Sequence, residues 1–342
     1  MAKGRQSLEA KLARLRSLRG AASGPEAVKE LRVALGDASN FVVADAATIV
    51  GEAHIAGLAQ ALVAAFERFF DNPVKTDKLC KAKLALAEAL NQLEFDEEDI
   101  FWKGARYVQF EPVWGGQQDT AAPLRVACAF ALVRLHARDV LPLLVDLLCD
   151  PEKTARAGAA QALAYSESET AALLLRLKAR TGDPEADVIS ECFNGILKLA
   201  PADGVAFVAE FLESVDLGVQ ESAILALGDS RRREALDVLK TFWEKPCDDQ
   251  LRETVLMAVS LLRLPAATEF LLGLVGSEEQ AVAWAAISAL ALHRYDARLR
   301  ERTEDAVSRN GRAALRAYFE ERFEVAKPAQ GEAGGGRVMR NS

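Results

Sequence analysis

This chain of 342 residues contains few of the residues that favour β-sheets. Its cysteines also do not form the pattern of a disulfide-stabilised secreted protein. It contains only 4 Tyr and 4 Trp, and Val, Ile and Thr rarely occur in runs, so a strand-rich architecture is disfavoured. The five cysteines are odd in number, widely spaced and without a C-x-x-C pair, which excludes a disulfide framework or a zinc cluster from our expectation.

Long apolar segments are missing as well. No run of 18 apolar residues occurs, so no transmembrane helix is expected. The segment 1–20 is polar and basic without an apolar centre, which is not the pattern of a secretory signal. We therefore expect a soluble, cytoplasmic protein.

Acidic residues outnumber basic residues in the chain, 50 Asp or Glu against 42 Lys or Arg. The formal net charge is −8, which argues against nucleic-acid binding over the whole surface. Segment 1–20 alone carries six Lys or Arg against one Glu. Nucleic acid is therefore an unlikely partner by sequence, and any binding of it would use these basic ends.

Alanine and leucine are abundant, with 62 and 46 copies, and both favour helices. They recur in fixed columns, and a search for self-similarity aligns eight segments on one apolar anchor each. Successive anchors are 40, 42, 31, 33, 31, 32 and 31 residues apart, a period typical of stacked helix pairs. The anchors are Val50, Leu90, Leu132, Leu163, Ile196, Leu227, Val259 and Leu290.

Two polar columns support the same register. Thirteen residues before the first five anchors stands an aspartate, and Ser214, Pro246 and Ser277 replace it in the last three units. Seven residues before several anchors stands a basic residue. The aspartates are Asp37, Asp77, Asp119, Asp150 and Asp183, and the basic residues are Lys83, Arg125, Arg156 and Arg252.

The segment 148–163, Leu-Cys-Asp-Pro-Glu-Lys-Thr-Ala-Arg-Ala-Gly-Ala-Ala-Gln-Ala-Leu, resembles the HEAT-repeat family, in particular its phycobilisome-lyase-type variant with an armadillo-type fold. The resemblance covers residues 25–293. It implies an all-α, right-handed α-α superhelix of about eight helix pairs with helical caps. It also implies a hydrogen-bonded ladder that joins the basic column to the aspartates.

The chain is accordingly divided into four parts. Residues 1–24 are expected to form a basic capping helix and a linker, and residues 25–295 the repeat solenoid. Residues 296–324 are expected to form C-terminal capping helices, because a terminal unit must cover its apolar face. The Gly-rich segment 325–342 is predicted to be disordered.

The two long anchor spacings mark insertions of about ten residues. The first lies around residues 69–78. The second, residues 101–120, is an aromatic loop with two of the four tryptophans, and aromatic and Arg side chains dominate interface hot spots. Its candidate binding residues are Trp102, Lys103, Arg106, Tyr107, Gln109, Glu111, Trp114, Gly115 and Gly116. The alternative is that the loop folds back and plugs the groove between units two and three.

No motif for catalysis, phosphate binding or metal binding is found, and the three histidines fall in different units, so no cofactor or metal is expected. The leading hypothesis is a non-catalytic scaffold that binds a protein partner through its concave face and the segment 101–120. Small-ligand binding or lyase-type catalysis at the same loop is the alternative, and nucleic-acid binding through the basic ends is a weaker one.

Overall fold

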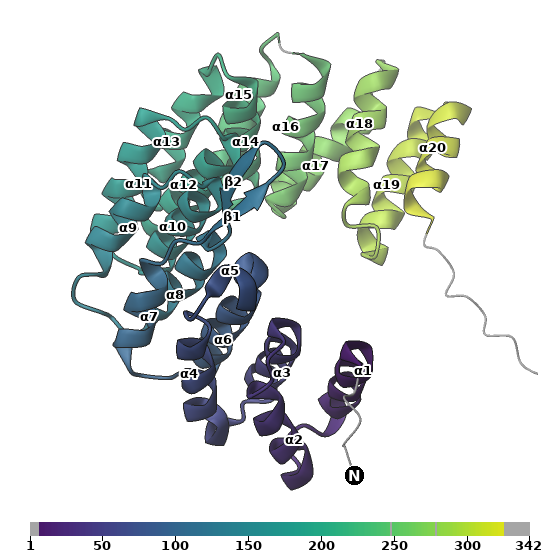
Figure 1. The fold of residues 1–342 in the computed structure, drawn as a ribbon. Helices are drawn as coiled ribbons and strands as arrows, with labels where there is room; N and C mark the ends of the chain where they lie inside the picture. The colour runs from purple at the N-terminus through teal and green to yellow at the C-terminus, as the bar shows by residue number, and fades with distance from the viewer. Residues whose placement is uncertain (1–6, 247, 278, 325–342) are drawn as a thin grey trace, which may run out of the picture. The chain divides into compact units, whose positions relative to one another are not determined.

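The computed structural model describes residues 7–246, 248–277 and 279–324. The predicted tail 325–342, the first six residues of the N-terminal cap and Cys247 lie outside these described residues. The described chain is all-α apart from one β-hairpin (Figure 1), and it divides into two compact units, residues 1–204 and 205–342.

Unit 1 stacks antiparallel helix pairs whose second helices form one continuous layer. In this layer α3 packs on α6, α6 on α8, α8 on α10 and α10 on α12. The helices of unit 1 are α1 (Leu8–Leu18), α2 (Pro25–Leu35), α3 (Asn40–Glu52), α4 (Ala59–Arg68), α5 (Pro73–Thr76), α6 (Lys81–Gln92), α7 (Glu98–Ala105), α8 (Ala122–Arg134), α9 (Val140–Leu148), α10 (Lys153–Tyr165), α11 (Glu169–Thr181) and α12 (Ala186–Leu199).

Unit 2 repeats the arrangement, with α14, α16, α18 and α20 packed in sequence. Its last two described helices, α19 and α20, are rich in charged residues. The helices are α13 (Gly204–Ala209), α14 (Leu217–Asp229), α15 (Arg233–Trp243), α16 (Asp249–Leu261), α17 (Pro265–Val275), α18 (Gln280–Ala291), α19 (Ala297–Asn310) and α20 (Ala313–Phe323).

The apolar anchors lie in the core of each unit. All eight are buried, each at most 1% exposed, so the sequence period corresponds to one layer of packing. Small residues allow the second helices to approach closely: a Cβ on Gly158 of α10 would lie 2.3 Å from a methyl of Val126 on α8. The prediction of an all-α solenoid of helix pairs is therefore confirmed.

The turns that lead from one unit to the next share a left-handed residue. Four residues after six of the anchors, a non-glycine residue has φ between 51° and 55° and ends the second helix. The positions are His54, Glu94, His136, Glu167, Arg231 and Arg263. Left-handed residues commonly close α-helices, and glycine is the usual choice. Two of the three histidines are thus turn residues of the architecture.

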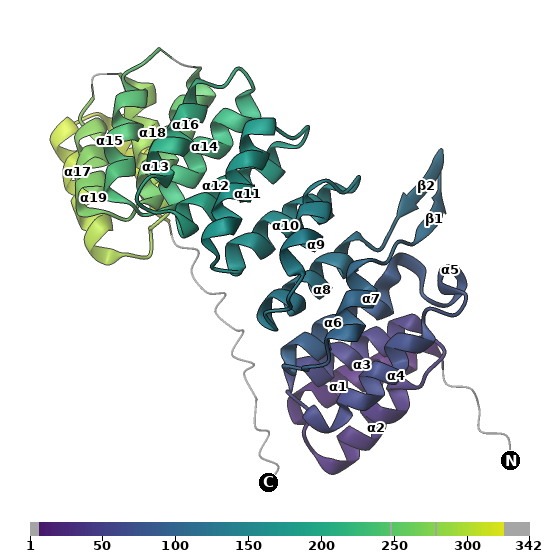
Figure 2. The same ribbon diagram turned by 90° about the vertical axis from the view of Figure 1, so that its left-hand side faces the viewer.

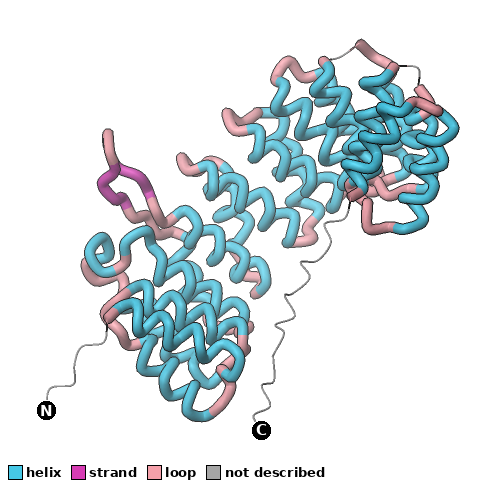
Figure 3. The backbone as a smooth tube through the Cα atoms, turned by 90° about the vertical axis from the view of Figure 1, so that its right-hand side faces the viewer, coloured by secondary structure: helices cyan, strands magenta, loops and turns pink. Residues whose placement is uncertain are grey.

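The segment 101–120 differs from the irregular loop that the sequence predicts. Its first residues complete α7, and residues 110–119 form an antiparallel hairpin of β1 (Phe110–Val113) and β2 (Gly116–Asp119). The hairpin projects beyond the stacked helices of unit 1 (Figures 2 and 3). The two-residue turn Trp114-Gly115 closes it, and Gly115 takes a φ of +90° that glycine adopts without strain. Because the hairpin projects outward, it does not plug the helix stack.

Within the described residues, no helix is both long enough and apolar enough to cross a lipid bilayer.

Candidate functional site

The two insertions lie side by side on one edge of unit 1 and are bonded to each other. The first runs from the end of α4 through α5 to a 3₁₀ turn, Lys78–Cys80, and the second is the hairpin with its flanks. Figure 2 shows α5 next to the base of the hairpin. We call residues 69–80 and 106–121 together the double insertion.

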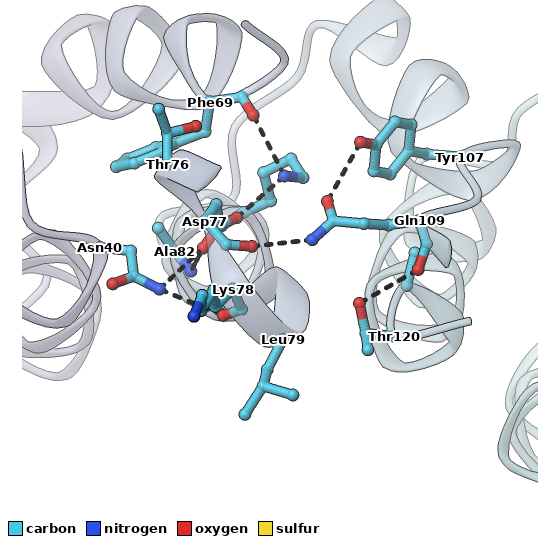
Figure 4. A network of polar contacts seen from close by, with 12 residues as sticks. Asn40, Phe69, Thr76, Asp77, Lys78, Leu79, Ala82, Tyr107, Gln109 and Thr120 are labelled. Carbon is cyan, nitrogen blue, oxygen red and sulfur yellow. Dashed lines mark hydrogen bonds and ion pairs between the residues drawn. The ribbon is translucent and has the colours of Figure 1, made fainter. Parts of the chain in front are cut away.

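Asp77 is the centre of the first insertion (Figure 4). It is fully buried, and its carboxylate accepts the backbone N–H groups of Ala82 at 2.7 Å and Lys83 at 3.1 Å. The Lys83 ammonium, also buried, donates to the same carboxylate at 2.9 Å and to the Phe69 carbonyl at 3.2 Å. A buried charge pair is tolerated only when its remaining hydrogen-bonding groups are satisfied, and this one is.

Gln109 and Glu111 join the second insertion to the first. The Gln109 side-chain amide donates to the Asp77 carbonyl and to the Glu111 carboxylate, both at 2.8 Å. The same Glu111 oxygen accepts the backbone N–H of Leu79 at 2.6 Å and the Thr120 hydroxyl at 2.8 Å. Burial alone raises the pKa of Glu111, but these hydrogen bonds outweigh it and hold the pKa below its usual value.

Asp119 ends the hairpin and begins the ion-pair ladder. Arg125 donates to the Asp119 carboxylate at 2.6 Å and reaches the next aspartate, Asp150, at 2.9 Å. Arg156 then makes a two-point contact with Asp183 at 2.8 and 3.0 Å. Asp37, in the first unit, pairs with Lys11 of α1 at 2.5 Å.

The aspartate column has a second role that explains its replacement by serine. Asp150 and Asp183 each accept the backbone N–H of the residue two positions on, at 2.9 and 3.0 Å, and Ser214 and Ser277 do the same at 3.1 and 3.2 Å. Asp and Ser both close such turns. Serine preserves the turn and loses the ion pair.

The ladder prediction is wrong for Arg252. Within the described residues its guanidinium pairs with no aspartate and lies over the Trp243 ring, 5.1 Å from the ring centre. The reason is that the two positions it could reach by the pattern of the other units are Pro246 and Ser277, and neither carries a carboxylate.

The predicted binding residues separate into two sets. Tyr107, Gln109 and Glu111 face inward: the Tyr107 hydroxyl donates to Gln109 at 3.1 Å, and its ring packs edge-on against Phe70 at 4.8 Å. These three side chains hold the insertions together and are not free to anchor a ligand.

The other candidates face outward. On α7, Trp102 bonds Glu98 at 3.1 Å, Lys103 pairs with Glu67, and Arg106 lies 4.7 Å from the Trp102 ring centre. At the tip of the hairpin, Trp114 is fully exposed beside Gly115 and Gly116. The aromatic side chains on α7 and at the tip are thus on different parts of the insertion.

Besides Trp114, four exposed apolar residues of the double insertion escaped the sequence reasoning, which looked for tryptophan and tyrosine. Phe110 is 58% exposed and Leu79 66%, while Val108 and Val113 are close to half exposed. Contiguous exposed apolar side chains mark interaction sites. We call Leu79, Val108, Phe110, Val113 and Trp114 the insertion surface. The Gly115-Gly116 pair is the one signal of a hairpin turn in this segment.

A shallow hollow of about 420 Å³ lies on the second-helix face of unit 1, between α6 and α8. Its walls include Leu84, Val126 and Phe130, and Glu88 stands at its side. Partial burial raises the pKa of the Glu88 carboxyl, although the side chain still reaches solvent. This face therefore combines apolar and acidic groups.

The ionisable groups of the double insertion differ in burial and in their partners. Among the described residues, no three His, Cys, Asp or Glu side chains gather where they could hold a metal ion. Burial raises the pKa of the Cys80 thiol to about 12, and a thiol in that state is a poor nucleophile. Burial likewise raises the pKa of Tyr107 to about 12. The carboxylates of Asp77, Glu111 and Asp119 are engaged in internal hydrogen bonds.

Comparisons with known proteins give structural likenesses only. No family model matches the chain, and no curated protein matches it. Solved structures that resemble it include the complex of CpcE and CpcF of phycocyanin lyase from Nostoc sp. PCC7120, at 21% identity over 69% of this chain and 91% of that chain with a TM-score of 0.36. Human deoxyhypusine hydroxylase in complex with glycerol matches at 17% identity over 85% and 92% of the two chains with a TM-score of 0.28.

An engineered protein matches at 18% identity over 94% of this chain and 96% of that chain, with a TM-score of 0.34. At these sequence identities and TM-scores, the activity of a matched protein cannot be assigned to this chain. Its own stacked helix pairs, with their repeating turns and ladder, are HEAT-like in architecture.

Proposed function

We propose that this chain is a non-catalytic HEAT-like scaffold that holds a protein partner on the insertion surface. The observation that carries the proposal is the exposure of five large apolar side chains on a hairpin and turn that are rigidly bonded to the helix stack. Exposed aromatic and aliphatic residues on a preorganised element bind with little loss of conformational entropy.

The polar network beneath the insertion surface supports the same function. Leu79 has a φ of +61°, a region that a branched side chain rarely occupies, and the bond from its backbone N–H to Glu111 holds it there. Strain of this kind persists only where the surroundings fix it. The result is a leucine side chain presented to solvent next to the hairpin.

The second-helix face of unit 1 would extend the contact. Its hollow beside Phe130 could receive an apolar side chain of the partner, and Glu88 could pair with a basic one. The sequence predicts binding through a concave face, and this hollow would be one point of contact on the second-helix face of unit 1.

The test is an affinity pull-down from a lysate of the source cells with the purified full-length chain. The amount of bound partner is compared between the wild type and the variants. Trp114→Ala and Phe110→Ala together should weaken capture by about ten-fold or more, because each removes a potential hot-spot side chain. The matched control is Leu173→Ala with Leu177→Ala, which removes two side chains exposed to a similar degree on α11. The thermal midpoint should stay unchanged in both.

Three outcomes would contradict the proposal. Capture that survives the hairpin double variant would place the binding elsewhere. A lower thermal midpoint with intact capture would assign the aromatic residues to stability. A small molecule released on denaturation from the wild type and absent from the variant would favour the ligand-binding or lyase-type alternative at the same surface.

A further inference from the structure

A second, chemically different surface lies on unit 2, at the turns that lead from each second helix to the next unit. Because successive helices run antiparallel, the α14–α15, α16–α17 and α18–α19 turns share one edge of this unit (Figure 1). Arginine recurs in all three. We call Arg231, Arg232, Arg233, Arg263, Arg294 and Arg298 the arginine edge.

None of these six guanidinium groups forms an ion pair within the described residues. Arg294 lies over the Tyr295 ring, 5.2 Å from its centre. Elsewhere in unit 2 acids predominate: residues 205–324 contain 21 Asp or Glu against 15 Lys or Arg. Unpaired positive charge is therefore concentrated on one edge of an acidic unit.

A hollow of about 650 Å³ lies between the α16–α17 and α18–α19 turns. Leu271, Leu290 and Leu299 line it together with Arg263, Arg298 and Arg302. Leu271, Leu290 and Leu299 form its apolar floor and are nearly fully buried, so most of the apolar surface open to a ligand comes from Leu292 and Tyr295, which also line the hollow and are 47% and 74% exposed.

The nearby acids are already engaged. Arg302 is paired with Glu269. Asp296 caps α19 by accepting the backbone N–H groups of Arg298 and Leu299 at 2.9 and 3.2 Å. Asp229 and Glu234 flank the three arginines of the α14–α15 turn, and Asp296, which keeps its negative charge, lines the hollow near Arg298. Arg263 has no acid within five residues in the sequence, so its positive charge is the least opposed by neighbouring residues.

We propose that the arginine edge binds an acidic, extended segment of a partner protein, with an apolar side chain of that segment on the leucine floor. The spacing supports an extended chain. Packed helices lie ~8–10 Å apart, so neighbouring turns on this edge are separated by about that distance. A polyproline II chain has three residues per turn and rises ~3.1 Å per residue, so carboxylates on every third residue lie on one face, ~9 Å apart, and match the arginines.

A nucleic acid fits less well. Duplex DNA carries a phosphate charge every ~1.7 Å and would bring many of them near the acidic faces of the unit. Phosphates also make no use of a leucine floor, whereas an acidic peptide with apolar residues satisfies both parts of the hollow. This surface is independent of the insertion surface, which lies in the other unit.

The experiment measures fluorescence anisotropy of a fluorescein-labelled 12-residue peptide with Glu at every third position and Leu and Ser between, added to the full-length chain at low salt. Arg263→Glu with Arg298→Glu should weaken binding by about ten-fold or more, since each reversal replaces an attraction with a repulsion. Arg138→Glu, at an equivalent turn of unit 1, is the matched control and should leave binding unchanged. A peptide of equal composition with its Glu residues clustered should bind more weakly.

A second variant separates binding from folding. Arg263→Gly removes the guanidinium at a left-handed position that glycine adopts freely, so the thermal midpoint should stay or rise while peptide affinity falls. Equal affinity of Arg263→Gly and wild type would overturn the proposal. So would capture of duplex DNA or inorganic phosphate, but not of the peptide, by the wild type.

Discussion

The charge pairs inside unit 1 belong to the ladder that the resemblance to HEAT repeats implies. A basic residue six positions after an aspartate pairs with it in Asp77–Lys83 and Asp119–Arg125. Arg156 stands at the same interval from Asp150 but pairs with the carboxylate of Asp183. The Arg125–Asp150 and Arg156–Asp183 contacts join neighbouring units. Arg252 fits the column but has no acidic partner, since Pro246 and Ser277 stand where the partner would be.

The buried Lys83–Asp77 pair yields a stability prediction. Lys83→Met would leave the Asp77 carboxylate buried without its counter-charge, which should cost about 3–5 kcal/mol of unfolding free energy. Lys29→Met is the control, because the Lys29–Glu26 pair is exposed to solvent. This substitution should change the unfolding free energy by less than ~0.5 kcal/mol. Urea unfolding measures both. Adding Asp77→Asn to Lys83→Met should recover part of the loss, and a simply additive result would contradict the pairing.

Asp183 predicts a dependence of stability on pH. Burial alone would raise the pKa of this carboxyl, but hydrogen bonds from Arg156 and Lys178 outweigh it and lower the pKa to about 2. A depressed folded-state pKa stabilises the fold above the unfolded value near 4 and loses that contribution as the pH falls toward 2. The loss should be roughly 2 kcal/mol.

The measurement is the urea midpoint of wild type and Asp183→Asn between pH 6 and pH 2. The variant should be less stable at pH 6 and should lose less stability on acidification. Parallel curves for the two proteins would show that Asp183 does not carry the effect.

Among the elements, the helices and their order are predictable from the sequence, and the hairpin is not. The anchor columns predict each second helix because apolar residues recur at helical spacing. The hairpin strands are four residues long, β2 is polar throughout, and no third strand pairs with them in the part of the chain that the structure describes, so the pattern of an amphipathic strand is weak. The inward role of Gln109 and Glu111 was also beyond the sequence, since it depends on an insertion 30 residues earlier.

The left-handed residues that end the second helices, four positions after the anchors, predict how glycine substitutions there change stability. Glu167→Gly should raise the unfolding free energy by roughly 0.5–1 kcal/mol, because Glu167 has a φ of +54° and a side chain is penalised there. Ala200 occupies the same column with a φ of −126°, so Ala200→Gly should lower stability through greater freedom of the unfolded chain. Equal effects of the two substitutions in thermal unfolding would contradict this account.

At the scale of the whole chain, the repeat period predicts one continuous array, whereas the contacts form two units. The anchor spacing does not change across the boundary, so periodicity alone could not reveal it. What changes is the first helix of the pair that follows: α13 has only six residues and a 3₁₀ turn follows it. Short helices bury less apolar surface and couple their neighbours more weakly.

The unequal ladder predicts that the units respond differently to acid. Ion pairs hold the pKa values of Asp37 and Asp183 in unit 1 below their usual range, while Ser214, Pro246 and Ser277 replace the aspartates in unit 2. Hydrogen exchange measured at pH 6 and pH 3, corrected for intrinsic rates, should show a greater loss of protection in residues 25–204 than in residues 205–324. An equal loss in both would show that the ladder does not govern acid stability.

The shared Glu111 makes the double insertion a single structural unit. Deleting either insertion would strand hydrogen-bonding groups of the other, because Leu79, Gln109 and Thr120 all meet at that carboxylate. Sequences that gain or lose one insertion should therefore gain or lose both. For the same reason, transplanting residues 69–80 and 106–121 together into another helical-repeat protein should transfer the insertion surface, whereas the hairpin alone should not.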